Sequence, residues 1–77
     1  MAESFKDKRV VFPSGKQKAF LESINQKLTV AAMARASNRS ERAIRDWRRE
    51  KFSMSLTAVR ALSARTRIPI PKDVLIR

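Results

Sequence analysis

Residues 29–51, TVAAMARASNRSERAIRDWRREK, contain the pattern that decides the expected fold. Apolar residues recur at helical spacing over residues 30–36 and again over residues 41–51, which predicts two short helices. Thr29 and Ser40 are good N-caps for the first and the second helix, and Asn38 is the non-glycine residue type that best tolerates a positive φ. We therefore expect two helices joined by a tight turn.

Five side chains in this stretch have the chemistry that two closely packed helices require. Ala34 is small enough to let the second helix approach, and Asn38 supplies the positive φ of the turn. Ile44 is a branched apolar residue, placed to hold the second helix against the first. Met33 and Trp47 are expected to provide the remaining core contacts. Together these five residues predict a helix-turn-helix.

Two more helices are predicted on either side of this pair. Apolar residues at spacings of three and four predict an amphipathic helix over residues 16–27. Ser55 is a good N-cap for another helix, which must end near Thr66 because Pro69 prevents its continuation. The predicted fold class is therefore all-α, a small bundle of four to five helices.

The two ends of the chain differ in character. Residues 1–15 mix charged and apolar residues and finish in a Pro-Ser-Gly sequence, so we expect an N-terminal arm that is partly extended or mobile. The helical domain is expected to span residues 16–77. Its last stretch, residues 68–76, is rich in Ile, Val and Leu. That stretch predicts either a short fifth element that packs back on the bundle or a chain that continues in a larger protein.

The charge balance indicates a polyanionic partner. The 77 residues include 18 Lys and Arg against 7 Asp and Glu, a formal net charge of +11. Self-repulsion of this size destabilises a compact domain, and a nucleic acid relieves it on binding. We therefore expect binding to nucleic acid.

Composition also argues against several other classes of protein. The chain has no His and no Cys, so the usual zinc ligands and the commonest catalytic base and thiol nucleophile are missing. We expect no enzyme activity, metal, cofactor or small-molecule ligand. No apolar run has the length of a membrane span, and the first residues lack the apolar stretch that is typical of a signal peptide. The expected location is intracellular, in the cytoplasm, and nucleoid-associated in a bacterium or archaeon.

Residues 29–68 resemble the phage-repressor-like helix-turn-helix domain, of the Cro/XRE or lambda-repressor type. The likeness rests on Thr29, on the sequence SERAIRDW from Ser40, and on a helix that opens at Ser55-Leu56 and ends before Ile68-Pro69. Three positions depart from the family pattern: Asn38 replaces glycine, Arg39 stands where an apolar residue is usual, and Glu50 stands where many members have glycine.

This resemblance implies sequence-specific binding of double-stranded DNA, with the second helix of a motif over residues 30–49 in the major groove. The function implied is that of a transcriptional regulator or of the DNA-targeting domain of a larger protein. The order of elements and the IPIP sequence over residues 68–71 are also similar to helix-turn-helix segments of LAGLIDADG homing-endonuclease-like proteins. No LAGLIDADG motif occurs here, so nuclease chemistry is not implied.

The motif geometry then assigns roles along residues 39–51. The N-terminal part of such a helix meets base edges, so the candidates for base contacts are Glu41, Arg42 and Arg45. The candidates for contacts with the DNA backbone are Arg39, Ser40, Arg48, Arg49 and Lys51. Further basic residues near the N-terminus could act as an arm on the backbone or in the minor groove: Lys6, Lys8 and Arg9.

Each assignment has a competing interpretation as ordinary surface chemistry. Glu41 and Arg45 are four residues apart in the favourable order for a helical ion pair. For Asp46 we expect an ion pair with Arg42 or Arg49 within the helix, in preference to a contact with DNA. The lysines of the first helix, residues 16–27, are expected to form a solvated face.

Two other kinds of partner remain as alternatives to DNA. An RNA-binding domain would explain the charge, although the chain has no Tyr and its Phe residues lie on apolar stripes. A protein-interaction module would explain the apolar residues 68–76 as a docking segment. Nothing in the sequence resembles a dedicated dimer helix, so a monomer or a weak dimer is expected.

Overall fold

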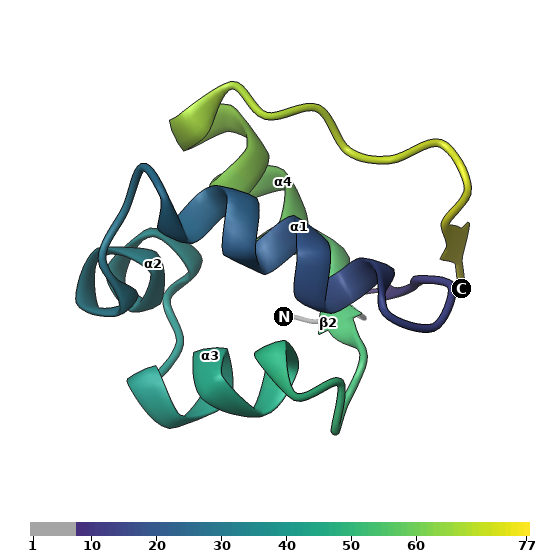
Figure 1. Cartoon of the computed structure of the whole chain (residues 1–77), viewed down its shortest axis with the longest axis horizontal. Coiled ribbons are helices and arrows are strands. Elements are labelled where there is room, and N and C mark those ends of the chain that lie inside the picture. Colours follow the sequence, from purple (N-terminus) through teal and green to yellow (C-terminus); the bar gives the residue numbers. More distant parts are fainter. Residues whose placement is uncertain (1–7) are drawn as a thin grey trace, which may run out of the picture.

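The computed structural model of the chain describes residues 8–77 and contains four helices and three short strands (Figure 1). The elements in chain order are β1 (Arg9–Val11), α1 (Lys16–Asn25), α2 (Val30–Ser37), α3 (Glu41–Arg48), β2 (Met54–Ser55), α4 (Leu56–Thr66) and β3 (Leu75–Ile76). In the part described, none of the helices combines the length and apolarity needed to cross a membrane.

The prediction of an all-α fold is wrong, because the three strands form an antiparallel sheet. β1 lies in the centre, with β2 on one side and β3 on the other. Val10 pairs with Met54 in β2 and with Ile76 in β3. Strands of two or three residues are too short to show the alternation by which a strand is identified in a sequence. The fold is therefore mixed, with helices and a small sheet.

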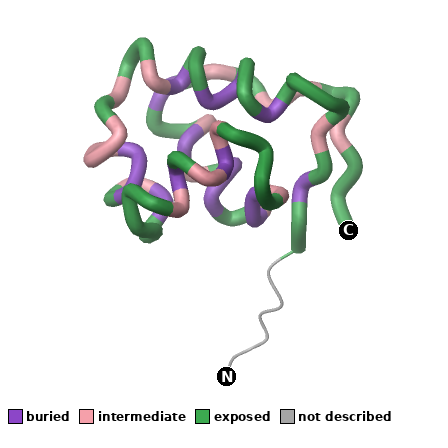
Figure 2. The backbone as a smooth tube through the Cα atoms, turned by 60° about the horizontal axis from the view of Figure 1, so that its bottom comes forward, coloured by how far each residue is buried: buried purple, intermediate pink, exposed green. Residues whose placement is uncertain are grey.

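The sheet and the helices share one hydrophobic core. Figure 2 shows buried residues along the inward side of each helix and in β1. Val10 and Met54, both fully buried, bring the sheet into contact with the helices. The other buried apolar residues are Phe20, Leu21, Ile24, Met33, Ala34, Ile44, Trp47, Ala58, Val59 and Leu62. Burial of Val10 makes part of the predicted N-terminal arm a structural element.

The C-terminal stretch packs back on the domain, which is one of the two outcomes predicted for it. α4 ends at Thr66, and Arg67 takes a left-handed conformation with φ of 61°. The chain then crosses the molecule to reach β3 beside β1 (Figure 1). Ile68, Ile70 and Val74 pack against the core along this path. The additional element expected after the four helices is therefore the strand β3.

Three of the four helices begin at the hydroxyl N-caps that the sequence predicts. Thr29, Ser40 and Ser55 each accept a hydrogen bond from the backbone N–H three residues later, at 3.1 to 3.2 Å. The predicted end of the third helix at Lys51 is wrong. α3 ends at Arg48, and Glu50 turns the chain with a positive φ of 59°. This left-handed residue stops the helix.

Candidate nucleic-acid interface

The turn between α2 and α3 has the conformation that its sequence predicts. Asn38 takes a φ of 58°, and the N–H of Arg39 donates to the carbonyl of Ala34 at 2.9 Å. The buried Ser37 hydroxyl donates to the carbonyl of Met33 at 2.8 Å. The bond from Arg39 helps to satisfy the carbonyl of Ala34, one of the last four carbonyls of α2.

The inward face of α3 is fastened to the rest of the domain by two large side chains. Ile44 is fully buried and Trp47 is 5% exposed. Met33 and Ala34 of α2 belong to the same buried cluster. These four side chains have the burial that the motif requires of them. The opposite face of α3 is consequently turned to the solvent.

The three candidates for base contacts lie on this solvent-facing side. Glu41, Arg42 and Arg45 are all exposed. Glu41 and Arg45 form an ion pair of 3.2 Å with side chains 48% and 58% exposed. An exposed pair at this spacing stabilises a helix by only about 0.2–0.5 kcal/mol. DNA can therefore replace this pair at little cost.

The candidates for backbone contacts lie at the two ends of α3. Ser40 accepts a hydrogen bond from the N–H of Ala43 and still has a hydroxyl proton to donate. Arg39 is exposed in the turn before the helix. Past the C-terminal end, Arg49 and Lys51 are exposed, while Arg48 is half-buried.

Of the three basic residues expected to form an N-terminal arm, the structure describes Lys8 and Arg9. Lys6 lies outside the described residues. Lys8 is exposed, and its carbonyl accepts from the N–H of Leu56 at 2.7 Å. The guanidinium of Arg9 donates to the carbonyl and the hydroxyl of Ser53 at 2.6 and 3.2 Å. Arg9 is thus engaged within the fold.

A hollow of about 240 Å³ between α1 and α3 brings four cationic side chains together. Its lining residues are Lys18, Arg45, Arg48 and Arg49. Lys18 belongs to α1, whose lysines the sequence assigns to a solvated face. No local pattern could have identified Lys18, because only the packing of α1 on α3 brings it beside the arginines.

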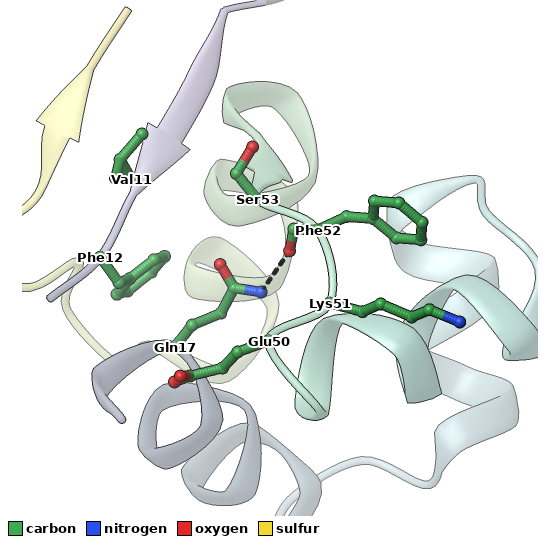
Figure 3. Close-up of a pocket in the computed structure, with 7 residues that line it drawn as sticks. All are labelled: Val11, Phe12, Gln17, Glu50, Lys51, Phe52 and Ser53. Carbon is green, nitrogen blue, oxygen red and sulfur yellow. Dashed lines mark hydrogen bonds between the residues drawn. The ribbon is translucent and has the colours of Figure 1, made fainter. Parts of the chain in front are cut away.

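Two polar side chains join the C-terminal end of α3 to the N-terminal end of α1. The buried amide of Gln17 donates to the carbonyls of Trp47 and Phe52, both at 2.8 Å. Figure 3 shows the second of these bonds. The carboxylate of Glu50 accepts from the N–H groups of Gly15 and Lys18 at 2.9 and 3.0 Å. We call Gln17 and Glu50 the α1–α3 clasp.

Glu50 replaces the N-cap side chain that α1 lacks. Gly15 occupies the N-cap position of α1 and has no side chain to accept a hydrogen bond. The backbone N–H groups of Lys18 and Gly15 stabilise the ionised carboxylate and lower the pKa of Glu50 below its usual value of 4.5. This role explains why a glutamate stands at a position with positive φ.

A second hollow of about 210 Å³ lies beside the clasp, between β1 and the loop after α3 (Figure 3). Gln17 and Glu50 line it together with Val11, Phe12, Lys51, Phe52 and Ser53. Figure 3 shows the side chains of Lys51 and Phe52 pointing away from the clasp. Phe52 is 55% exposed, a large apolar surface beside a cation.

We also looked for metal-binding groups in the described residues and for similar proteins. Among residues 8–77, no group of three or more carboxylate, imidazole or thiol side chains is placed to hold a metal ion. Comparison of the chain with protein-family models, with curated proteins and with solved structures finds no match.

Proposed function

We propose that this protein binds double-stranded DNA sequence-specifically, with α3 in the major groove. The observation that carries this proposal is the division of α3 into two faces. Ile44 and Trp47 anchor one face in the core, while Glu41, Arg42 and Arg45 stand exposed on the other. An anchored helix with a solvated, arginine-bearing face suits the major groove, which admits an α-helix.

In this proposal Arg42 and Arg45 contact base edges and Glu41 assists them. An arginine fork can pair with O6 and N7 of guanine, and a glutamate can accept from N4 of cytosine. Each such contact discriminates against a wrong base by about 1–3 kcal/mol. Binding separates the Glu41–Arg45 ion pair, whose two partners then contact neighbouring bases.

The cations around α3 hold the sugar-phosphate backbone. The proposed backbone contacts come from Arg39, Ser40, Arg48, Arg49 and Lys51. Contacts of this kind set affinity and register without carrying sequence information. The net charge of +11 supports a polyanionic partner in general.

The likeness to phage-repressor-like domains supports the same assignment at the level of the motif. With a sheet beside its four helices, the fold is not the all-helical bundle of that family, so the likeness is proposed for α2, the turn and α3 alone. The role proposed is that of a transcriptional regulator or a DNA-targeting domain, without catalysis, acting as a monomer or weak dimer in the cytoplasm or nucleoid.

Selection from a random duplex DNA library at about 150 mM salt, an ionic strength near the physiological one, tests the proposal. Enrichment of a short motif supports sequence-specific binding. Recovery of duplexes without enrichment contradicts the specificity that we propose. A parallel selection offers the protein RNA and other proteins. If no duplex is recovered and RNA or a protein is, the corresponding alternative replaces the proposal.

A further inference from the structure

The hollow lined by Lys18, Arg45, Arg48 and Arg49 gathers four cationic side chains and has no acidic lining residue. Its cations come from two helices that only the tertiary fold brings together. Like charges gathered in this way repel one another, and the repulsion is relieved when an anion lies between them.

Acidic groups near the hollow compensate only part of this charge. Glu41 pairs with Arg45 at 3.2 Å. Glu50 attracts the ammonium group of Lys18, but its carboxylate oxygens accept hydrogen bonds from the backbone N–H groups of Gly15 and Lys18. Within residues 8–77, no side-chain hydrogen bond or ion pair engages Lys18, Arg48 or Arg49.

The size of the hollow suits a small anion. Its volume of about 240 Å³ compares with roughly 30 Å³ for one molecule of liquid water. A phosphate group with part of its hydration shell can therefore enter. Arginine forks bind phosphate oxygens bidentately, and lysine adds a compact point charge.

We propose that this hollow binds one phosphate group of the DNA backbone, with Lys18 of α1 as a ligand beside Arg48 and Arg49 at the C-terminal end of α3. This inference rests on the proposed function and extends its interface from α3 to α1. The phosphate then bridges the two helices and sets how far α3 enters the groove. Arg45, at the boundary of the hollow, connects the phosphate contact with the bases.

The clasp explains how the hollow keeps its shape. Glu50 binds the N–H of Lys18 itself, and Gln17 binds the carbonyl of Trp47. These bonds fix the first turn of α1 against the last turn of α3, so the cations of both helices are positioned before a ligand arrives. Such preorganisation reduces the ordering cost of binding.

The test compares Lys18→Ala with Lys16→Ala, which removes the same charge from the same helix. Lys16 is exposed and lines a different hollow, near Asp73. Affinity for one duplex is measured for both variants and the unaltered protein between 50 and 200 mM salt. Removing one phosphate contact lowers the slope of log affinity against log salt by about 1.

Raising the salt from 50 to 200 mM weakens the binding of both proteins. The affinity loss of Lys18→Ala is expected to be smaller than that of the unaltered protein by a factor of about 3 to 4. Lys16→Ala is expected to keep the slope of the unaltered protein. Equal slopes for the two variants would overturn the inference. Absence of duplex binding by the unaltered protein would instead refute the proposed function, so the two failures are distinct.

Titration with inorganic phosphate, followed by NMR, separates the two sources of a phosphate group. The signals of Lys18, Arg48 and Arg49 are expected to shift together, and the Lys18→Ala variant is expected to lose the shifts of both arginines. Small shifts spread over all cationic residues would overturn the site. If phosphate shifts these three signals but Lys18→Ala keeps the salt slope of the unaltered protein, the hollow binds free phosphate and not the DNA backbone. That result would contradict our inference.

Discussion

The two ends of α3 are held in different ways although they lie in one helix of eight residues, Glu41–Arg48. The N-terminal end is capped by its own Ser40, and its exposed side chains contact one another through the Glu41–Arg45 pair. The C-terminal end is fastened by Gln17 and Glu50 to a helix far away in the sequence.

This difference separates stability from recognition. Gln17 and Glu50 are needed for the fold, because their bonds connect α1 with the end of α3. The exposed Glu41–Arg45 pair contributes little to the fold, and its side chains are available for a partner. We therefore expect substitutions of the clasp and of the buried anchors of α3 to change stability, and substitutions of the exposed charged side chains to change DNA binding.

The largest effect is expected for Trp47→Ala. Trp47 is 5% exposed and packs in the core, and such truncations cost about 3–5 kcal/mol. The free energy of unfolding, measured by urea denaturation, should fall by this amount or the chain should fail to fold. Trp47→Phe is expected to lose much less. A loss below 1 kcal/mol for Trp47→Ala would contradict the anchoring of α3.

Gln17→Ala tests the clasp with the next largest effect. It removes one buried and one part-buried hydrogen bond, to the carbonyls of Trp47 and Phe52. An unsatisfied buried group costs about 1–3 kcal/mol. Gln26→Ala is the control, since Gln26 is exposed at the other end of α1. Equal unfolding free energies for the two variants would show that the clasp adds nothing.

Glu41→Ala tests the other end of the helix. It removes an exposed ion pair worth about 0.2–0.5 kcal/mol, so the midpoint of urea unfolding should scarcely move. The motif selected by the DNA library should nevertheless change at one base pair. A clear loss of stability with no change in the selected motif would show that Glu41 serves the fold and not DNA recognition.

The smallest effect concerns pH and Glu50. Because folding lowers the pKa of Glu50 from 4.5, its carboxylate stabilises the fold above that pH. The stabilisation is lost as the pH falls through the lowered folded-state pKa. Glu50→Gln should therefore lower the thermal midpoint at pH 7, and the two curves should converge in acid. The control is Glu22→Gln, since Glu22 is exposed on α1. A difference independent of pH would refute the assignment.

Sequence reasoning predicted the parts of the fold that depend on local chemistry. Thr29, Ser40 and Ser55 cap their helices through bonds that span three residues, and Asn38 turns the chain by its own preference. Apolar spacing predicted the four helices for the same reason. The burial of Ile44 and Trp47 followed from their common helical face.

The parts that were missed depend on contacts between distant segments. Leu75 and Ile76 form a strand only because β1 offers them a partner. α3 ends three residues early because Glu50 turns back to cap α1, a demand that cannot be seen within α3 itself. Lys18 joins the arginines through the packing of two helices.

The most direct test of the proposed base and backbone contacts is to repeat the library selection with Arg45→Ala and Lys51→Ala. The base-contact role predicts that Arg45→Ala loses sequence preference at one base pair of the selected motif. The backbone role predicts that Lys51→Ala keeps the motif, binds all duplexes more weakly and has a salt slope lower by about 1. If both variants kept the motif and lost affinity to the same extent, α3 would hold DNA without specifying its sequence, and our central claim would be wrong.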